Sequence, residues 1–166
     1  LMAAANGVNT CIAEGRYNDF SIYPGKVFHY NPNTKVWTPS PVDVNLWGPY
    51  VDSEYDPQSG LIVVISKNKG LFTYDPLNKV GRQEISWFKP ELSYAQNLVY
   101  FPPNGKMYHI LNDGQVYEVT PDRSNFANST IVQITGITGT PPPLTIPSTS
   151  ETETGFAYDS ANQIIG

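Results

Sequence analysis

The stretch Gly70-Leu-Phe-Thr-Tyr-Asp-Pro76 decides the fold, because similar stretches occur twice more in this chain of 166 residues. The other two are Gly25-Lys-Val-Phe-His-Tyr-Asn-Pro32 and Gly114-Gln-Val-Tyr-Glu-Val-Thr-Pro121, so that the three prolines are 44 and 45 residues apart. Each stretch is typical of a glycine turn, a short alternating strand and a polar turn that ends at proline. A period of this length indicates a repeat architecture.

A second repeated unit lies between these stretches and consists of an apolar-aromatic strand that runs into a hairpin turn. Its copies are Tyr50–Gly60, Asn97–Gly105 and Gly155–Asn162. The first two copies lead into the further strands Leu61–Ser66 and Lys106–Leu111, and fourth strands are expected at Lys35–Thr38, Lys79–Ile85 and Ser129–Ile134. Four short strands in each period predict the blade of a β-propeller. Because a blade packs against neighbours on both faces, the strand can carry apolar residues on both of its sides, as Leu61–Ile65 does.

Composition supports an all-β fold and excludes some partners. The 11 tyrosines and 15 prolines favour strands and turns over helices. The net charge is −5 and the 10 basic residues form no patch, so we expect no nucleic-acid partner. The longest apolar run, Leu61–Ile65, is too short to cross a bilayer, so no membrane insertion is expected. The acidic composition, poor in lysine and rich in Thr, Asn and Tyr, favours a secreted, cell-surface or virion-surface location.

Part of this repeat resembles a known family. The stretch from Phe28 to Pro41 resembles the kelch-repeat signature of Tyr-Asp-Pro, a Thr, then Trp and a turn that carries proline. Phe72–Pro76 repeats its first half, with Gly81 at the position of Trp37. The chain departs from the kelch pattern where paired glycines usually follow the second strand; there it has Ser66-Lys67 and Leu111-Asn112. The spacing also resembles that of six-bladed lactonase-like propellers.

We therefore expect one partial β-propeller domain over residues 1–166, with approximate blades at 9–48, 49–96 and 97–154 and the start of another at 155–166. Residues 9–19 are interpreted as a second strand with no first strand before it. About three blades cannot close a ring. Either the chain is a fragment, or two copies form a head-to-tail homodimer in which the last strand of one copy completes the first blade of the other.

The resemblance to propellers implies a ligand face built from the loops between successive blades, here Pro39–Pro49, Ser86–Gln96 and Thr135–Thr154. The candidate ligand residues in these loops are Trp47, Trp87, Phe88 and Tyr94. Aromatic rings offer a large contact area at low entropy cost, which suits a glycan or a protein partner. The alternative is that these rings fill apolar gaps between blades.

Three acidic residues, Asp52, Glu54 and Asp56, alternate along one expected strand. Such carboxylates could bind a hard cation such as Ca²⁺, with Asp52 and Glu54 as the metal candidates. The alternative is that they are polar residues facing water, with Asp56 part of the turn. No other cofactor is expected.

No catalytic motif is present: HExxH, CxxC and GxSxG are all missing from the sequence. The only histidines, His29 and His109, would have to converge to form a copper site like that of kelch-type oxidases. The sequence thus favours a non-enzymatic binding module that uses its loop face. The alternatives are a propeller enzyme (a lactonase-like hydrolase, a lyase or a kelch-type oxidase) with its site at the channel mouth, and a purely structural role.

Overall fold

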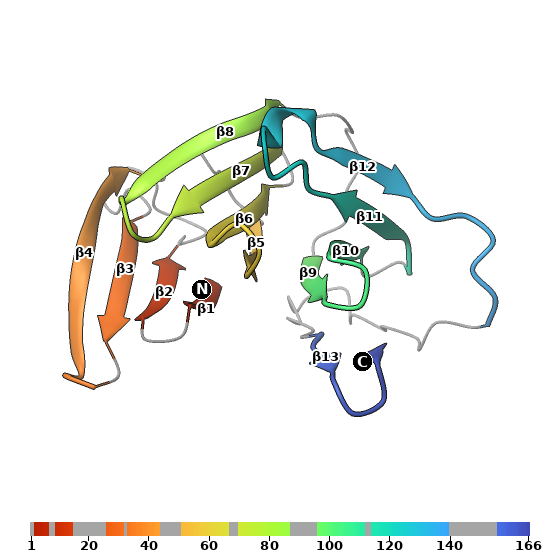
Figure 1. The fold of residues 1–166 in the computed structure, drawn as a ribbon, viewed down its shortest axis with the longest axis horizontal. Helices are drawn as coiled ribbons and strands as arrows, with labels where there is room; N and C mark the ends of the chain where they lie inside the picture. Colours follow the sequence, from red (N-terminus) through yellow and green to blue (C-terminus); the bar gives the residue numbers. More distant parts are fainter. Residues whose placement is uncertain are drawn as a thin grey trace, which may run out of the picture. The chain divides into compact units, whose positions relative to one another are not determined.

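The protein is all β in the parts that its computed structural model describes. These are residues 2–6, 9–14, 26–31, 33–43, 51–66, 70–86, 96–111, 114–139 and 156–166. They form three four-stranded antiparallel sheets and one two-stranded sheet (Figure 1). Within these residues the only helix is a three-residue 3₁₀ turn, Phe126–Asn128. The all-β expectation is therefore confirmed.

Strands follow chain order in every sheet, so each four-stranded sheet is a simple meander. The first sheet contains β1 (Met2–Asn6), β2 (Asn9–Glu14), β3 (Lys26–Asn31) and β4 (Val36–Asp43). The second contains β5 (Val51–Asp56), β6 (Leu61–Ser66), β7 (Gly70–Asp75) and β8 (Val80–Ser86). The third contains β9 (Gln96–Phe101), β10 (Lys106–Leu111), β11 (Val116–Thr120) and β12 (Thr130–Gln133). The two-stranded sheet pairs β13 (Tyr158–Asp159) with β14 (Ile164–Ile165).

The first sheet corrects one expectation. Residues 9–19 were expected to begin the blade at its second strand, but β1 pairs with β2 from Met2↔Ala13 to Asn6↔Asn9. Alanine has a low strand propensity, so the run of alanines in β1 carries no strand signal; its backbone pairing with β2 makes it a strand. The position that a second copy was expected to fill in this sheet is thus occupied by the chain itself. In the same sheet β4 continues to Asp43, into the expected loop Pro39–Pro49.

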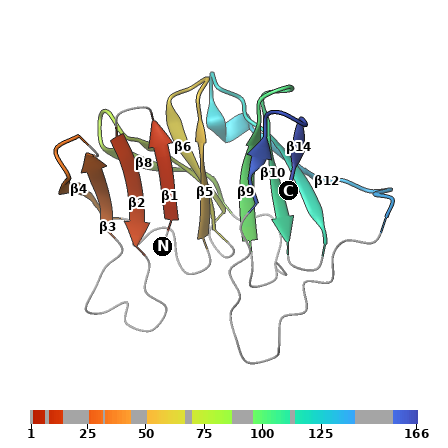
Figure 2. The same cartoon turned by 90° about the horizontal axis from the view of Figure 1, so that it is seen from below.

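The chain forms two compact units, residues 1–90 and 91–166. In the first unit β1 and β5, the first strands of their sheets, lie side by side (Figures 1 and 2). In the second unit β13 lies beside β9, and the Phe101 and Tyr158 rings meet edge to face with centroids 5.3 Å apart.

The core of the first unit lies on β6 and β7. Consecutive residues Ile62 to Ile65 are all buried, as are Leu71, Phe72 and Tyr74. Because successive side chains of a strand point to opposite faces, burial of consecutive residues means that both faces of the second sheet are covered. In the second unit β10 alternates instead: Met107, His109 and Leu111 are buried, whereas the residues between them are half-buried.

The β3–β4 and β7–β8 turns of the repeat are tight hairpin turns, led by Asn31 and Asp75 respectively. In the β7–β8 turn the Asp75 carboxylate accepts hydrogen bonds from the backbone N–H groups of Leu77 and Asn78, at 2.9 and 3.0 Å. The last turn residue takes the left-handed conformation, with φ of 57° at Lys79 and 58° at the equivalent Lys35. The Asx hydrogen bonds define the turn locally, so its sequence pattern could be recognised without the rest of the fold.

Candidate functional site

The four aromatic ligand candidates, Trp47, Trp87, Phe88 and Tyr94, lie outside the residues that the structure describes. The two metal candidates, Asp52 and Glu54, are described and lie on β5. Their register partners on β6 are Ile65 and Val63, respectively. The carboxylate pair Asp52–Glu54 therefore projects from the face of the second sheet that also carries two fully buried apolar residues.

This environment changes the acidity of Glu54. Burial raises the pKa of Glu54 to about 7, and repulsion from the Asp52 carboxylate adds to the rise, while a backbone hydrogen bond from Tyr55 opposes it. Asp52 itself accepts a hydrogen bond from the backbone N–H of Ser53 at 2.8 Å. A carboxyl group that titrates near neutral pH can take up and release a proton under physiological conditions, which general acid–base catalysis requires.

Asp56, the third alternating carboxylate, belongs to the β5–β6 turn. It is fully buried, and its side chain accepts hydrogen bonds from the Ser59 hydroxyl at 2.9 Å and from the Gln58 backbone N–H at 3.2 Å. Within the described part of the chain, no three His, Cys, Asp or Glu side chains gather in a group that could hold a metal ion. The pair alone offers fewer oxygens than the six to eight that Ca²⁺ takes, so the donor set fits this ion poorly.

A second polar group joins the first two sheets. The Nε2 atom of His29 on β3 lies 2.6 Å from the Tyr74 hydroxyl on β7, and that hydroxyl donates to the Ser40 hydroxyl on β4 at 2.9 Å. All three side chains are buried, and the His29 and Tyr74 rings meet nearly edge to face, with centroids 5.8 Å apart. Hydrogen bonding inside this inter-sheet cluster (His29, Ser40, Tyr74) offsets the cost of burying its polar atoms.

The surroundings of His29 favour the neutral form of its imidazole. Burial lowers the pKa of His29, and the positive charge of Lys79 lowers it further. His109, the other histidine, is buried on β10 of the second unit, opposite Leu98 and Tyr117. The two histidines thus belong to different units, and His29 packs between two sheets of its own unit.

Two features were not anticipated from the sequence. Tyr30 and Trp37 form an aromatic pair across β3 and β4, with ring centroids 4.8 Å apart and planes tilted by 37°. Trp37 keeps 49% of its surface exposed. The kelch-like signature contains both residues, but it does not reveal that they are direct cross-strand neighbours, which depends on the register of β3 and β4.

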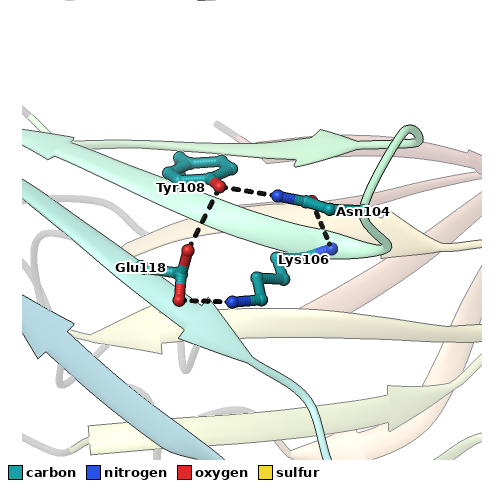
Figure 3. Close-up of polar contacts among 4 residues, drawn as sticks. All are labelled: Asn104, Lys106, Tyr108 and Glu118. Atoms are coloured by element: carbon teal, nitrogen blue, oxygen red, sulfur yellow. Dashed lines mark hydrogen bonds and ion pairs between the residues drawn. The ribbon is translucent and has the colours of Figure 1, made fainter.

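The other feature is a polar network on the third sheet (Figure 3). Glu118 accepts hydrogen bonds from Lys106 Nζ at 2.6 Å and from the Tyr108 hydroxyl at 3.2 Å. Asn104 donates its side-chain N–H to the Tyr108 hydroxyl at 2.8 Å and accepts the Lys106 backbone N–H at 3.0 Å. Lys106 and Glu118 side chains are about a third exposed, at 33% and 28%, so the polar network (Asn104, Lys106, Tyr108, Glu118) is open to solvent at its edge.

No protein-family model matches this sequence, and no curated protein matches it either. Among the described residues, no helix has the length and the apolar character that crossing a membrane requires.

Proposed function

We propose that this chain is part of a kelch-like β-propeller and acts as a non-enzymatic binding module, with a protein or a glycan as its ligand. The observation that carries the proposal is the succession of four-stranded meanders in one repeat phase, in which the first strands β1 and β5 lie side by side. Meanders that stack in this way are the building principle of propellers.

The proposed ligand face consists of the loops that join successive sheets. These loops contain Trp47, Trp87, Phe88 and Tyr94. Loops held by a rigid sheet scaffold are common binding sites, and aromatic residues dominate the binding energy of many interfaces. The rigid scaffold here is the second sheet, whose central strands are buried on both faces.

A glycan array and a peptide array, each probed with the whole chain, test this proposal. We expect a ligand whose affinity falls at least about tenfold in Trp47→Ala and in Trp87→Ala. Leu77→Ala serves as the matched control, because Leu77 is a 79% exposed apolar residue in the β7–β8 turn. Silence on both arrays, together with turnover of a small substrate, would overturn the proposal.

A propeller enzyme is the second candidate function, and the raised pKa of Glu54 is the observation that favours it. In this alternative Glu54 is the general acid or base of a lactonase-like hydrolase or a lyase, and burial, with the Asp52 charge beside it, keeps the pKa of Glu54 high. Chromogenic lactones, esters and glycosides provide the assay. The enzyme alternative predicts turnover that changes near pH 7 and disappears in Glu54→Gln; turnover that Glu54→Gln retains would remove Glu54 from this role. Adding Ca²⁺ to the same assays tests the cation alternative.

A further inference from the structure

One asparagine of the second unit has a hydroxyl residue two positions after it. Asn128-Ser129-Thr130 is the single place in the sequence where an asparagine is followed, after one residue other than proline, by Ser or Thr. This pattern is the acceptor signal for N-glycosylation, in which the asparagine side chain receives an oligosaccharide. So short a pattern also arises by chance, so the place of these residues in the fold must show whether the signal can be used.

The backbone presents the acceptor and the hydroxyl on the same side of the chain. Asn128 ends the 3₁₀ turn, and Ser129 continues with an extended backbone, at φ −58° and ψ 146°. Side chains two residues apart in an extended segment point to the same side. In agreement, Asn128 and Thr130 are exposed, whereas Ser129 between them is buried, with 8% of its surface exposed. Both groups that the signal requires are thus accessible from solvent.

The buried middle residue fixes this arrangement. The Ser129 hydroxyl accepts a hydrogen bond from the backbone N–H of Asp122 at 3.0 Å, and the Ser129 backbone N–H donates to the carbonyl oxygen of Phe126 at 3.1 Å. The Phe126 side chain is itself buried. The turn is therefore anchored by residues that a modification of Asn128 does not alter.

The contact that Asn128 makes within its turn is compatible with an attached sugar. Its side-chain amide donates a hydrogen bond to the Asp122 carboxylate. This amide has two N–H groups. Glycosylation replaces one of them, so one donor remains for Asp122. The exposed residues just before Asn128 in the sequence, Ser124, Asn125 and Ala127, are small or polar. The fold can therefore carry a glycan at Asn128 without losing a buried contact.

The turn lies at the opposite end of β12 from one loop of the proposed ligand face. Asn128 precedes β12, whereas the loop Thr135–Thr154 follows the other end of that strand. Within the third sheet β12 is an outer strand, next to β11 alone. A glycan on Asn128 therefore projects from the periphery of its sheet and leaves that loop open to a ligand.

We propose that Asn128 is an N-glycosylation site, modified while the chain passes through a secretory pathway. The donor is an oligosaccharide linked to a lipid pyrophosphate. A bond forms between Asn128 Nδ2 and C1 of the first sugar, while the bond from C1 to the pyrophosphate oxygen breaks. Nδ2 loses one proton, and the lipid pyrophosphate is the leaving group. The composition, which favours a secreted or surface location, agrees with this route, and the proposal does not depend on ligand binding.

Secretion of the whole chain from a eukaryotic cell line, behind an added signal peptide, tests the proposal. The intact mass should include an oligosaccharide, and peptide-N-glycosidase should remove it and leave aspartate at position 128. Asn128→Gln and Thr130→Ala should each abolish the modification, whereas Thr130→Ser should retain it. Asn33→Gln is the matched control: it changes an exposed asparagine that has Lys35 two positions later, and it should keep the glycan.

Thermal unfolding then tests whether the fold accommodates the glycan. The secreted chain should unfold at the same temperature as the chain made in the bacterial cytosol without the sugar, because Asn128 is exposed and keeps one donor for Asp122. Circular dichroism checks that each variant is folded, and Thr130→Ala gives the answer if Asn128→Gln does not fold. A secreted wild type without the sugar, a glycan that persists in Thr130→Ala, or an unfolding temperature that the glycan lowers would each overturn the proposal.

Discussion

Tyr74 and Tyr30 occupy the same position of the repeat, yet one is buried and the other is half-buried beside an exposed tryptophan. Their strands are alike, and so are the turns that follow them, with φ of 57° at Lys79 and 58° at Lys35. The difference comes from the surface that each tyrosine faces. Tyr74 packs on His29 and Ser40 of the first sheet. On the face of Tyr30, no described residue buries the neighbouring Trp37 to the same extent. Local sequence thus determines which residues form strands and turns, whereas packing against a neighbouring sheet determines how much each residue contributes to the free energy of unfolding.

The largest expected contrast is between an aromatic core residue of the second sheet and Trp37 of the first. Phe72 is fully buried, so Phe72→Ala should lower the free energy of unfolding by about 3–5 kcal/mol. Trp37→Ala removes a half-exposed ring and should cost under about 1 kcal/mol. Urea denaturation of dilute protein measures both. Equal losses would mean that the first sheet is packed as tightly as the second.

The other face of the second sheet can be probed through Glu54. Its pKa in the folded protein, about 7, lies above the ordinary value of 4.5, so folding favours the protonated form. The contribution of Glu54 to stability is therefore greatest below pH 4.5 and is lost as the pH rises through 7. Glu54→Gln is neutral at every pH and should stabilise the protein by about 2–3 kcal/mol at pH 8, with little change at pH 4.

Thermal unfolding of wild type and Glu54→Gln at these two pH values gives the measurement. Asp52→Asn removes the lesser of the two causes and should give a smaller gain at pH 8. A Glu54→Gln variant whose advantage is the same at both pH values would show that Glu54 is not held in an environment that raises its pKa.

Removal of the two tyrosine hydroxyls compares the equivalent positions directly. Tyr74→Phe leaves His29 and Ser40 without the buried hydroxyl between them and should cost about 1–2 kcal/mol. Tyr30→Phe should change stability by less than about 0.5 kcal/mol, because its side chain is only half-buried. Urea denaturation midpoints of the two variants and the wild type, measured in parallel, test both expected losses. A larger loss for Tyr30→Phe would reverse the comparison.

The smallest effects are expected at the turns, where the two sheets are alike. Lys35 and Lys79 both take the left-handed conformation that a side chain disfavours. Glycine adopts it without strain, so Lys35→Gly and Lys79→Gly should each stabilise by about 1 kcal/mol. Unequal gains in thermal stability would show that the turns also differ between the sheets.

Much of the scaffold could be predicted from the sequence because it depends on local signals. The strands Leu61–Ser66 and Lys106–Leu111 were predicted with their observed bounds, since an apolar or alternating run is enclosed there by turn residues. The strand Met2–Asn6 was missed because its alanines carry no such signal.

The candidate site was harder to predict, because its chemistry depends on burial. The alternation of Asp52 and Glu54 indicated a shared face, but the raised pKa of Glu54 comes first from the covering of that face. The inter-sheet cluster joins residues 34 and 45 positions apart in the sequence, and no short motif relates them. The proposed ligand face is supported by the aromatic character of four loop residues, and binding experiments must test it. These residues are Trp47, Trp87, Phe88 and Tyr94.

The packing of the second sheet on the first through Tyr74 is the central claim, and a double-mutant cycle tests it most directly. The cycle compares the free energies of unfolding of wild type, Tyr74→Phe, Ser40→Ala and the double variant. Because the two hydroxyls are hydrogen-bonded at 2.9 Å across the two sheets, we predict a coupling energy of about 1 kcal/mol. Strictly additive losses, with a coupling energy of zero, would contradict the contact and with it the face-to-face packing of the two sheets.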